Sequence, residues 1–381
     1  MMGGFSSDEQ VLVAGLWSLP GTGAVSIELV TAYSQGQLKA LIDRPFEEWL
    51  PAIDLPHQAG EVIAEAHQRG VRTLAEAAER LWRGCETTGT RLCFAGDAAY
   101  PRLLLDIERP PPLLFFKGPG ARGSPKHAVA MVGTRRAPGR VEANAFGLAH
   151  QLAHAGLVVV SGAAEGIDQA CHRGALSAHG ETWAFLGSSI DQIDAAPSKI
   201  AAPILDGGGT LFSEFPPGVR GGETTFPRRN RLISGSSEAT VVVRAPQKSG
   251  ALWTSKYARQ QGRVVLAVPG EVDERSAVGS NALIRSGEAR PCLEARDVTE
   301  AMGLPTGTVL IGPELRAPRP VPEDLSAEAR RVLQVLSGQP MDYDSLLAAS
   351  ALTSGQLSAA LTTLEIAEVV LEGAGRVYYR A

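Results

Sequence analysis

The chain has 381 residues, of which 44 % are hydrophobic and 20 % charged, a composition typical of a globular protein of two or three domains and not of a disordered one. The formal net charge of −5 disfavours a general nucleic-acid coat, but the charge is uneven: residues 1–100 carry −6, residues 101–300 carry +4 and residues 301–381 carry −3. No stretch approaches the ~18–20 apolar residues of a membrane span, and no basic-then-apolar signal opens the chain, so we expect a cytoplasmic protein with no membrane partner.

The four cysteines form neither a C-x-x-C motif nor a spacing typical of metal ligands. The sequence therefore predicts reduced, mostly buried thiols and no metal site.

Residues 1–95 are expected to form a helical N-terminal domain. Helical periodicity covers residues 11–19, 24–34, 37–43 and 57–84. The turn at Pro20-Gly21-Thr22-Gly23 is similar to the hairpin of helix-hairpin-helix (SAM-like) modules, whose N–H groups can bind DNA phosphate. A tight turn without a ligand is the alternative, and the acidic charge of this segment favours it.

Residues 96–295 are expected to form an α/β domain. Short apolar runs, many of them β-branched, end near Val132, Val160, Leu186, Phe215, Val243 and Val268, and helical segments separate most of them. This alternation predicts a doubly wound parallel sheet with right-handed crossovers. Its carboxyl edge is where such folds bind ligands.

The first strand of this domain ends in the turn Gly133-Thr134-Arg135-Arg136, and Arg140 follows shortly. The turn lacks a Walker lysine, and no clean G-x-G-x-x-G is present, so ATP hydrolysis by a P-loop and dinucleotide binding are both disfavoured. A phosphate-binding turn at a helix N-terminus remains, and the alternative is a sharp connection with exposed arginines.

The second strand ends in Ser161-Gly162 and continues to Gly166 before a helix begins. Gly162 and Gly166 permit close backbone approach, and the Ser161 hydroxyl can donate to a phosphate oxygen. Asp168 and His172, four residues apart on that helix, could pair as a catalytic dyad, but an N-capping or structural role for the aspartate is the alternative.

The segment Phe226-Pro227-Arg228-Arg229-Asn230-Arg231 combines three cations, an amide and an aromatic ring. Charge beside a stacking face is what single-strand binding requires. A helix N-terminus with surface arginines and a buried Phe226 is the alternative. Ser249 and Gly250 open a further helix, which carries Lys256, and offer another anion-facing amide cluster.

The segment from residue 296 to 325 is expected to be a linker, and residues 326–381 have the outline of a winged-helix domain with three helices and a hairpin. The expected recognition helix, residues 354–366, contains no Lys or Arg; only Arg376 and Arg380 in the wing are basic. Docking of a partner, or weak contact with DNA, is therefore favoured over sequence-specific readout.

Taken together, these motifs resemble the DprA (Smf) family of DNA-processing proteins. The stretches that carry the resemblance, spread over about 190 residues in consistent order, are YPRLLLDIERPPPLLFFKG, MVGTRRA, VVVSGAAEGIDQACHRGAL, FPRRNRLISGSS, VVVRAPQKSGALWTS, RVVLAVPGEV and GSNALIRSG.

The resemblance implies an extended Rossmann-like domain with a single-stranded DNA pocket at its switch point, homodimers, and loading of RecA recombinase on DNA during natural transformation. It implies neither an enzyme nor a cofactor. The DNA-binding residues that we expect on these grounds are Gly133, Thr134, Arg135, Ser161, Gly162, Gly166, Phe226, Arg228, Arg229, Asn230, Arg231, Ser249 and Gly250.

Two other classes of function remain open from the residues alone. A nucleotide hydrolase or phosphoribohydrolase on a related fold would use Asp168 with His172, or a nearby carboxylate such as Glu214. A pure adaptor would act through its winged helix and would not bind DNA through residues 127–290.

Overall fold

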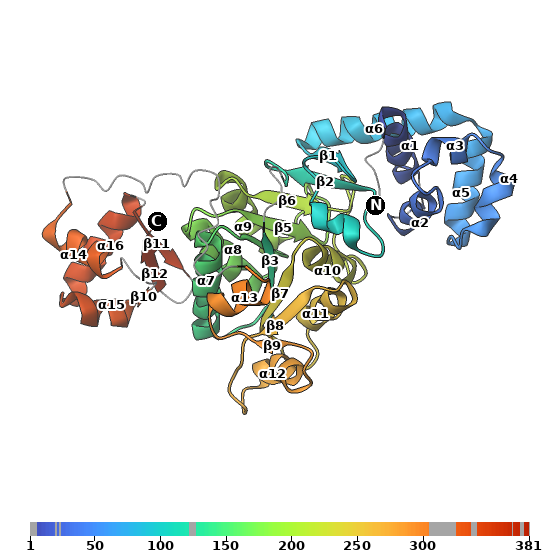
Figure 1. Cartoon of the computed structure of the whole chain (residues 1–381). Helices are drawn as coiled ribbons and strands as arrows, with labels where there is room; N and C mark the ends of the chain where they lie inside the picture. The colour runs from blue at the N-terminus through green and yellow to red at the C-terminus, as the bar shows by residue number, and fades with distance from the viewer. Residues whose placement is uncertain are drawn as a thin grey trace.

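The structure is a computed structural model, and it describes residues 6–19, 21–22, 24–121, 127–304, 325–336, 341–367, 369–373 and 377–380. Figure 1 shows three parts in chain order: a group of helices, a central sheet covered by helices, and a small C-terminal unit. The three-part α/β architecture predicted from the sequence is confirmed.

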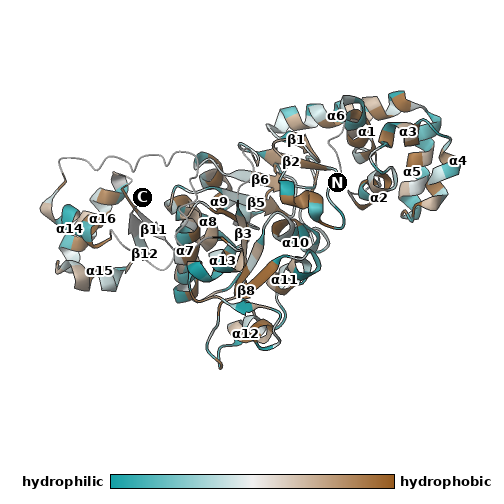
Figure 2. Ribbon diagram, viewed as in Figure 1, coloured by the Kyte–Doolittle hydropathy of each residue, from teal (hydrophilic) through white to brown (hydrophobic). Residues whose placement is uncertain are grey.

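The N-terminal part is helical, as predicted. Its helices are α1 (Ser7–Trp17), α2 (Ala24–Tyr33), α3 (Leu38–Ile42), α4 (Phe46–Trp49), α5 (His57–Gln68) and α6 (Val71–Thr88), with a 3₁₀ turn, η1, at Leu50–Ala52. α6 is amphipathic and mixes hydrophilic and hydrophobic residues along its length (Figure 2). In the turn after α1, the Thr22 hydroxyl donates to the carbonyls of Leu16 and Leu19, whereas Pro20 and Gly23 lie outside the described residues.

The central sheet has nine strands in the order β1-β2-β6-β5-β4-β3-β7-β8-β9. The predicted runs form β3 (Ala128–Gly133), β4 (Val158–Ser161), β5 (Thr182–Leu186), β6 (Thr210–Ser213), β7 (Ala239–Arg244) and β8 (Val264–Ala267), all mutually parallel, and β9 (Arg290–Pro291) pairs parallel to β8. Strand order runs outward from β3 to β6 on one side and from β7 to β9 on the other. The β3–β7 pair is therefore the switch point of a doubly wound sheet.

Helices cover both faces of the sheet, and alternate residues of each strand enter different cores. On β3, Ala130 and Val132 pack with residues of α10 (Thr225–Gly235), α11 (Gly250–Gln260) and α12 (Val278–Arg285). Val129 and Met131 pack on the other face with α7 (Gly139–His154), α8 (Ile167–Ser177) and α13 (Ala295–Ala301). Burial of both faces explains why the strands are continuous apolar runs.

Two strands at one side of the sheet were not predicted. β1 (Arg91–Phe94) pairs with β2 (Leu113–Lys117), and β2 pairs with β6, both in antiparallel fashion; the 3₁₀ turn η2 (Arg102–Asp106) lies between β1 and β2 along the chain. Side chains on one face of β1 and β2 join the apolar core of the N-terminal helices. Helix α9 (Ala195–Asp206) contributes to the same core, and the centres of the Trp17 and Phe115 rings lie 6.4 Å apart. The N-terminal helices and the sheet therefore share one apolar core.

Of the predicted domain boundaries, the one between residues 295 and 296 falls inside a helix, α13. β1 belongs to the sheet although its residues lie in the segment 1–95, and α13 occupies the first part of the predicted linker, where Val298 is buried. A further 3₁₀ turn, η3 (Arg275–Ala277), precedes α12. Most of the predicted linker, residues 305–324, lies outside the described residues.

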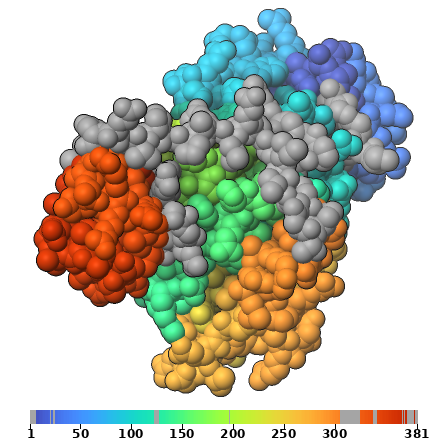
Figure 3. Space-filling model, turned by 60° about the vertical axis from the view of Figure 1, so that its left-hand side comes forward, coloured from blue at the N-terminus to red at the C-terminus, as the bar shows by residue number. Residues whose placement is uncertain are grey.

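The C-terminal unit contains α14 (Ala327–Val335), β10 (Met341–Asp342), α15 (Tyr343–Ser350), α16 (Ser354–Ile366), β11 (Val370–Gly373) and β12 (Val377–Arg380). Its three strands pair in the order β10-β12-β11 around a separate small core, and its residues form a lobe of their own (Figure 3). This arrangement is the predicted winged helix; Arg376 of its wing lies outside the described residues.

All four cysteines are buried and unpaired, as predicted. No helix within the described parts of the chain is long and apolar enough to cross a lipid bilayer.

Candidate nucleic-acid interface

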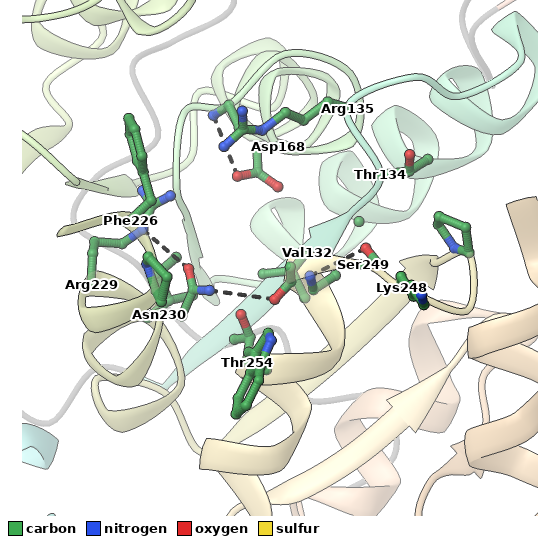
Figure 4. A pocket seen from close by; sticks show the side chains of 18 of the residues that line it. Val132, Thr134, Arg135, Asp168, Phe226, Arg229, Asn230, Lys248, Ser249 and Thr254 are labelled. Atoms are coloured by element: carbon green, nitrogen blue, oxygen red, sulfur yellow. Dashed lines mark hydrogen bonds between the residues drawn. The ribbon is translucent and has the colours of Figure 1, made fainter. Parts of the chain in front are cut away.

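A cavity of about 710 Å³ opens at the carboxyl edge of the sheet, above the β3–β7 switch point. Four chain segments line it: the turn after β3, the loop after β4 with Asp168 of α8, the residues from Gly222 into the first turns of α10, and the loop from β7 into α11 (Figure 4). The strand–turn–helix units singled out in the sequence therefore converge on one site. This is the position at which doubly wound sheets bind their ligands.

The turn after β3 contributes exposed positive charge to the cavity. Arg135 and Arg136 both line it and are exposed, and the Arg135 guanidinium lies 5.5 Å from the centre of the Phe226 ring. Lys248, on the opposite loop, is a third exposed cation. Within the described residues, none of the three has a carboxylate partner within ion-pair distance, so their charge is available to an anion.

Arg229 lies at the inner wall of the cavity and is buried. Its Nη1 donates to the Gly162 carbonyl at 2.7 Å and also to the Phe185 carbonyl, which fastens α10 to the ends of β4 and β5. Burial lowers the pKa of the Arg229 guanidinium to about 10, with Arg135 acting in the same direction and Asp168 against it. Arg229 thus keeps its charge at neutral pH, and its hydrogen bonds hold α10 in position at the wall of the cavity.

Asn230 links the two helices that face each other across the cavity. Its Nδ2 donates to the Gly250 carbonyl at 3.3 Å, and its Oδ1 accepts from Arg229 Nε at 3.3 Å. At the start of α11, the Ser249 side chain accepts from the Ala251 N–H and so caps the helix. These bonds hold the first turns of α10 and α11 at a fixed separation.

Gly162 and Gly166, which were expected to approach phosphate, instead allow close packing of the chain beneath the cavity. A Cβ on Gly162 would stand 2.5 Å from Arg229 Nη1, and one on Gly166, whose φ is +78°, would stand 2.6 Å from the Thr134 carbonyl oxygen. Neither glycine is among the residues that line the cavity. Their absent side chains make room for the Arg229 guanidinium and for the turn after β3.

Ser161 does not reach the cavity either. Its hydroxyl is fully buried and donates to the Met131 carbonyl at 2.6 Å, which ties β4 to β3. Because its single hydroxyl proton is used inside the sheet, Ser161 is not placed to donate to a phosphate.

Arg228 and Arg231 lie on another face of α10, and the residues that line the cavity do not include them. Arg228 contacts Glu28 at 3.1 Å and Glu214 at 3.0 Å, and Arg231 contacts Glu28 at 2.5 Å and also pairs with Glu214. Burial, together with the nearby Glu214, raises the pKa of Glu28 to about 8 in spite of the two arginines. The four side chains join α2 to α10, so the two arginines serve the contact between the N-terminal helices and the sheet domain.

The hypothetical catalytic dyad does not form. Asp168 Oδ2 accepts from the Gly162 N–H at 3.1 Å and from the Ala164 N–H at 3.4 Å, and so it shapes the loop after β4. His172 lies in the core with its Nδ1 2.7 Å from the Thr182 hydroxyl. Burial raises the pKa of Asp168 and lowers that of His172 to about 3.

The tautomer of His172 follows from these contacts. The Thr182 hydroxyl donates its one proton to the Val159 carbonyl at 2.6 Å, so Nδ1 of the imidazole must be the donor to Thr182. Nε2 has no hydrogen-bond partner among the described residues. A neutral, buried histidine with no contact to Asp168 is structural.

Two other charged residues near these turns, Arg140 and Glu165, do not line the cavity. Arg140 pairs with Glu271 at 2.5 Å and with Glu274 at 3.3 Å, and Glu165 lies 3.7 Å from Lys199. Of the predicted site residues, those that line the cavity are Gly133, Thr134, Arg135, Phe226, Arg229, Asn230, Ser249 and Gly250.

Sequence reasoning missed lining residues on the β7–α11 segment. Lys248, Trp253 and Thr254 line the cavity, and none of them had been assigned to it. A signal was available: Lys248 directly precedes the Ser249-Gly250 helix start, and Trp253 and Thr254 follow one helical turn later. No cluster of metal-ligating side chains is found in the described part of the chain.

The chain matches a known protein family over most of its length. The sequence matches the family described as DNA recombination-mediator protein A over residues 91–303, and the DprA winged helix domain over residues 316–376. A putative DNA processing protein DprA of Mycobacterium tuberculosis is 36 % identical over 337 residues, covering 81 % of this chain and 82 % of that protein. Protein Smf of a Synechocystis strain is 32 % identical over 313 residues, covering 74 % of this chain and 78 % of that protein.

A solved structure shares the fold. The X-ray structure of DNA processing protein A from Streptococcus pneumoniae superposes with a TM-score of 0.61 at 24 % identity, covering 78 % of this chain and 98 % of that one. From the family match and the identity to curated relatives, this chain belongs to the DprA (Smf) family, the DNA recombination-mediator protein A family.

Proposed function

We propose that the cavity binds single-stranded DNA without sequence preference. The observation that carries this proposal is the set of three exposed, unpaired cations, Arg135, Arg136 and Lys248, placed around a cavity that also holds the Phe226 ring. Cations that lack carboxylate partners neutralise phosphates and release their counterions. An aromatic face accepts any base, since base stacking is worth roughly 1–3 kcal/mol and tolerates every sequence.

The size of the cavity favours a single strand. Its volume of about 710 Å³ is within the range of roughly 300–1,000 Å³ of sites that enclose small ligands. Such a space accepts individual nucleotides of a flexible strand, whereas a rigid duplex would remain outside it. Reading of particular base edges is not needed for this mode of binding.

The contacts of the titratable groups disfavour the alternative of a nucleotide hydrolase or phosphoribohydrolase. Glu214 pairs with Arg228 and Arg231, Asp168 is held by backbone N–H groups, and His172 is neutral and buried. A general base must come within hydrogen-bond reach of its substrate. Glu214 and His172 do not line the cavity, and Asp168, which does, already accepts hydrogen bonds from the N–H groups of Gly162 and Ala164. We therefore propose a binding protein and not a nucleotide hydrolase or phosphoribohydrolase.

Family membership supports the biological role. We propose a cytoplasmic homodimer that acts as a recombination mediator, binds incoming DNA in natural transformation and loads RecA on it. This role requires binding and no catalysed reaction: the bound strand is kept free of secondary structure while the recombinase assembles.

A competition experiment tests the binding mode. A fluorescent oligothymidine bound to the protein is displaced by unlabelled single strand or by duplex of the same length, and anisotropy is recorded. We expect the single strand to compete at least tenfold more effectively; equal competition by duplex would refute the proposal. Incubation with nucleotides, followed by assays for released base and phosphate, should give no product.

A further inference from the structure

A second cavity, of about 880 Å³, adjoins the first. It lies between α11 and α12, and it shares with the first cavity Pro227, Lys248, Ser249, Gly250 and Trp253. Lys248 and Ser249 stand on the side of the first cavity where α11 begins (Figure 4). The first turn of α11 is therefore a ridge between two parts of one continuous depression.

The second cavity is also cationic. Lys256, Arg259 and Arg285 line it and are exposed, in addition to the shared Lys248. Among the described residues that line it, Glu288 is the one carboxylate, and it lies 2.8 Å from Arg259, whose charge neutralises it. Lys248, Lys256 and Arg285 have no carboxylate within ion-pair distance in the described residues, so the excess of positive charge continues from one cavity into the other.

Trp253 lies at the ridge with 52 % of its surface exposed. The Lys256 ammonium is 5.1 Å from the centre of its ring. About half of the indole surface is therefore left in water, and a ligand that covered it would bury further apolar area. A ring flanked by lysine is the combination on which a nucleic-acid base stacks while its phosphate is neutralised.

We propose that a DNA single strand passes from the first cavity over α11 into the second, with one base stacked on Trp253 and its phosphates beside Lys256 and Arg285. The inference rests on the proposed function and extends its site. Gly250 to Arg259 span about 14 Å at about 1.5 Å per residue. At no less than about 3.4 Å per nucleotide, this length accommodates at most about four further nucleotides.

The test measures the affinity for oligothymidines of increasing length by fluorescence anisotropy, for the full-length protein and three variants. In the wild type, the affinity rises as nucleotides are added beyond those that fill the first cavity. Trp253→Ala should bind long oligomers roughly 5- to 100-fold more weakly, from the energy of one base stack. The loss should be larger for long oligomers than for the shortest binding oligomer, because Trp253 borders the first cavity as well as the second. Trp253→Phe should retain most of the gain, because phenylalanine still offers a stacking face. Tyr33→Ala, which removes an exposed aromatic ring from α2, is the matched control and should bind as wild type does.

Intrinsic fluorescence gives an independent readout. Of the five tryptophans, Trp17, Trp49 and Trp183 are buried, Trp82 is half-buried and Trp253 is exposed. A long oligothymidine should quench the emission of the wild type, and Trp253→Phe should abolish most of the quenching. Equal affinity of Trp253→Ala and wild type for long oligomers, with no quenching, would overturn the inference while binding of short oligomers upheld the proposed function. If the wild type binds no oligomer of any length, the proposed function itself fails.

Discussion

The Arg229 guanidinium occupies the space that a side chain at position 162 would need, and it donates to the carbonyl of Gly162 itself at 2.7 Å. The glycine and the arginine lie 67 positions apart in the chain, on the loop after β4 and on α10. Their contact fixes the position of α10, which forms one wall of the cavity, relative to the loop after β4. A glycine beneath the cavity therefore decides where the Arg229 wall stands.

Replacement of Gly162 by alanine should displace Arg229 and widen the pocket. Because the new Cβ would stand 2.5 Å from a buried guanidinium nitrogen, we expect a loss of about 1–3 kcal/mol in the free energy of unfolding, together with weaker DNA binding. Chemical denaturation measures the first effect and anisotropy the second. Gly147→Ala on α7 is the control, since no atom lies within 4 Å of its Cβ; a helical glycine replaced in this way should stabilise slightly. Wild-type stability and binding for Gly162→Ala would contradict this role.

Replacement of Arg231 by alanine should act on stability before it acts on binding. The side chain is 13 % exposed, and its partners Glu28 and Glu214 are 3 % and 1 % exposed. Removing Arg231 takes one of two cations from the buried Glu214 carboxylate and breaks the contact with Glu28, and the loss of one member of a buried ion pair costs about 3–5 kcal/mol. Thermal unfolding checks this, with the exposed Arg72→Ala as a control expected to change stability by under about 1 kcal/mol. A variant as stable as wild type that fails to bind DNA would instead place Arg231 in the interface.

The contrast between Arg229 and Arg231 explains what the sequence could predict and what it could not. Composition identified a cationic segment, and strand ends identified the edge of the sheet at which it would lie. At 3.6 residues per turn, however, Phe226, Arg229 and Asn230 share one side of α10, whereas Arg228 and Arg231 share another. Treating the segment as one cluster ignored this periodicity.

Other features depended on long-range contacts that a single sequence does not contain. Nothing near Glu28 signals that it meets two arginines some 200 positions later. Likewise, the position of Ser161 at a strand end suggests a free hydroxyl in a loop, but this hydroxyl donates its hydrogen bond to the carbonyl of a neighbouring strand. The apolar runs, by contrast, specified the parallel strands, because burial on both faces leaves a continuous pattern.

The stability of the protein should depend on the protonation of His172 in mildly acidic solution. Its pKa in the folded state is about 3, below the ordinary value of 6.5, so the unfolded chain binds a proton in this interval and the folded chain does not. The contribution of His172 is therefore fully present above about pH 6.5 and is lost as the pH falls toward 3, by up to about 1.4 kcal/mol per pH unit.

Urea denaturation at pH 7, 6 and 5 checks this dependence. His172→Gln removes the titrating group, so the difference in unfolding free energy between wild type and variant should shrink as the pH falls. A difference independent of pH would mean that the folded protein accepts the proton on His172.

The salt dependence of DNA binding tests the central claim most directly. For single strands, the slope of log K against log salt concentration is about −0.7 for each phosphate contact, so Arg135→Ala should reduce its magnitude by about 0.7 and weaken binding roughly tenfold. Arg140→Ala, a 58 % exposed arginine that pairs with Glu271 and lies outside the cavity, is the matched control. The account predicts a shallower slope for Arg135→Ala and an unchanged slope for Arg140→Ala; identical slopes for wild type and Arg135→Ala would contradict it.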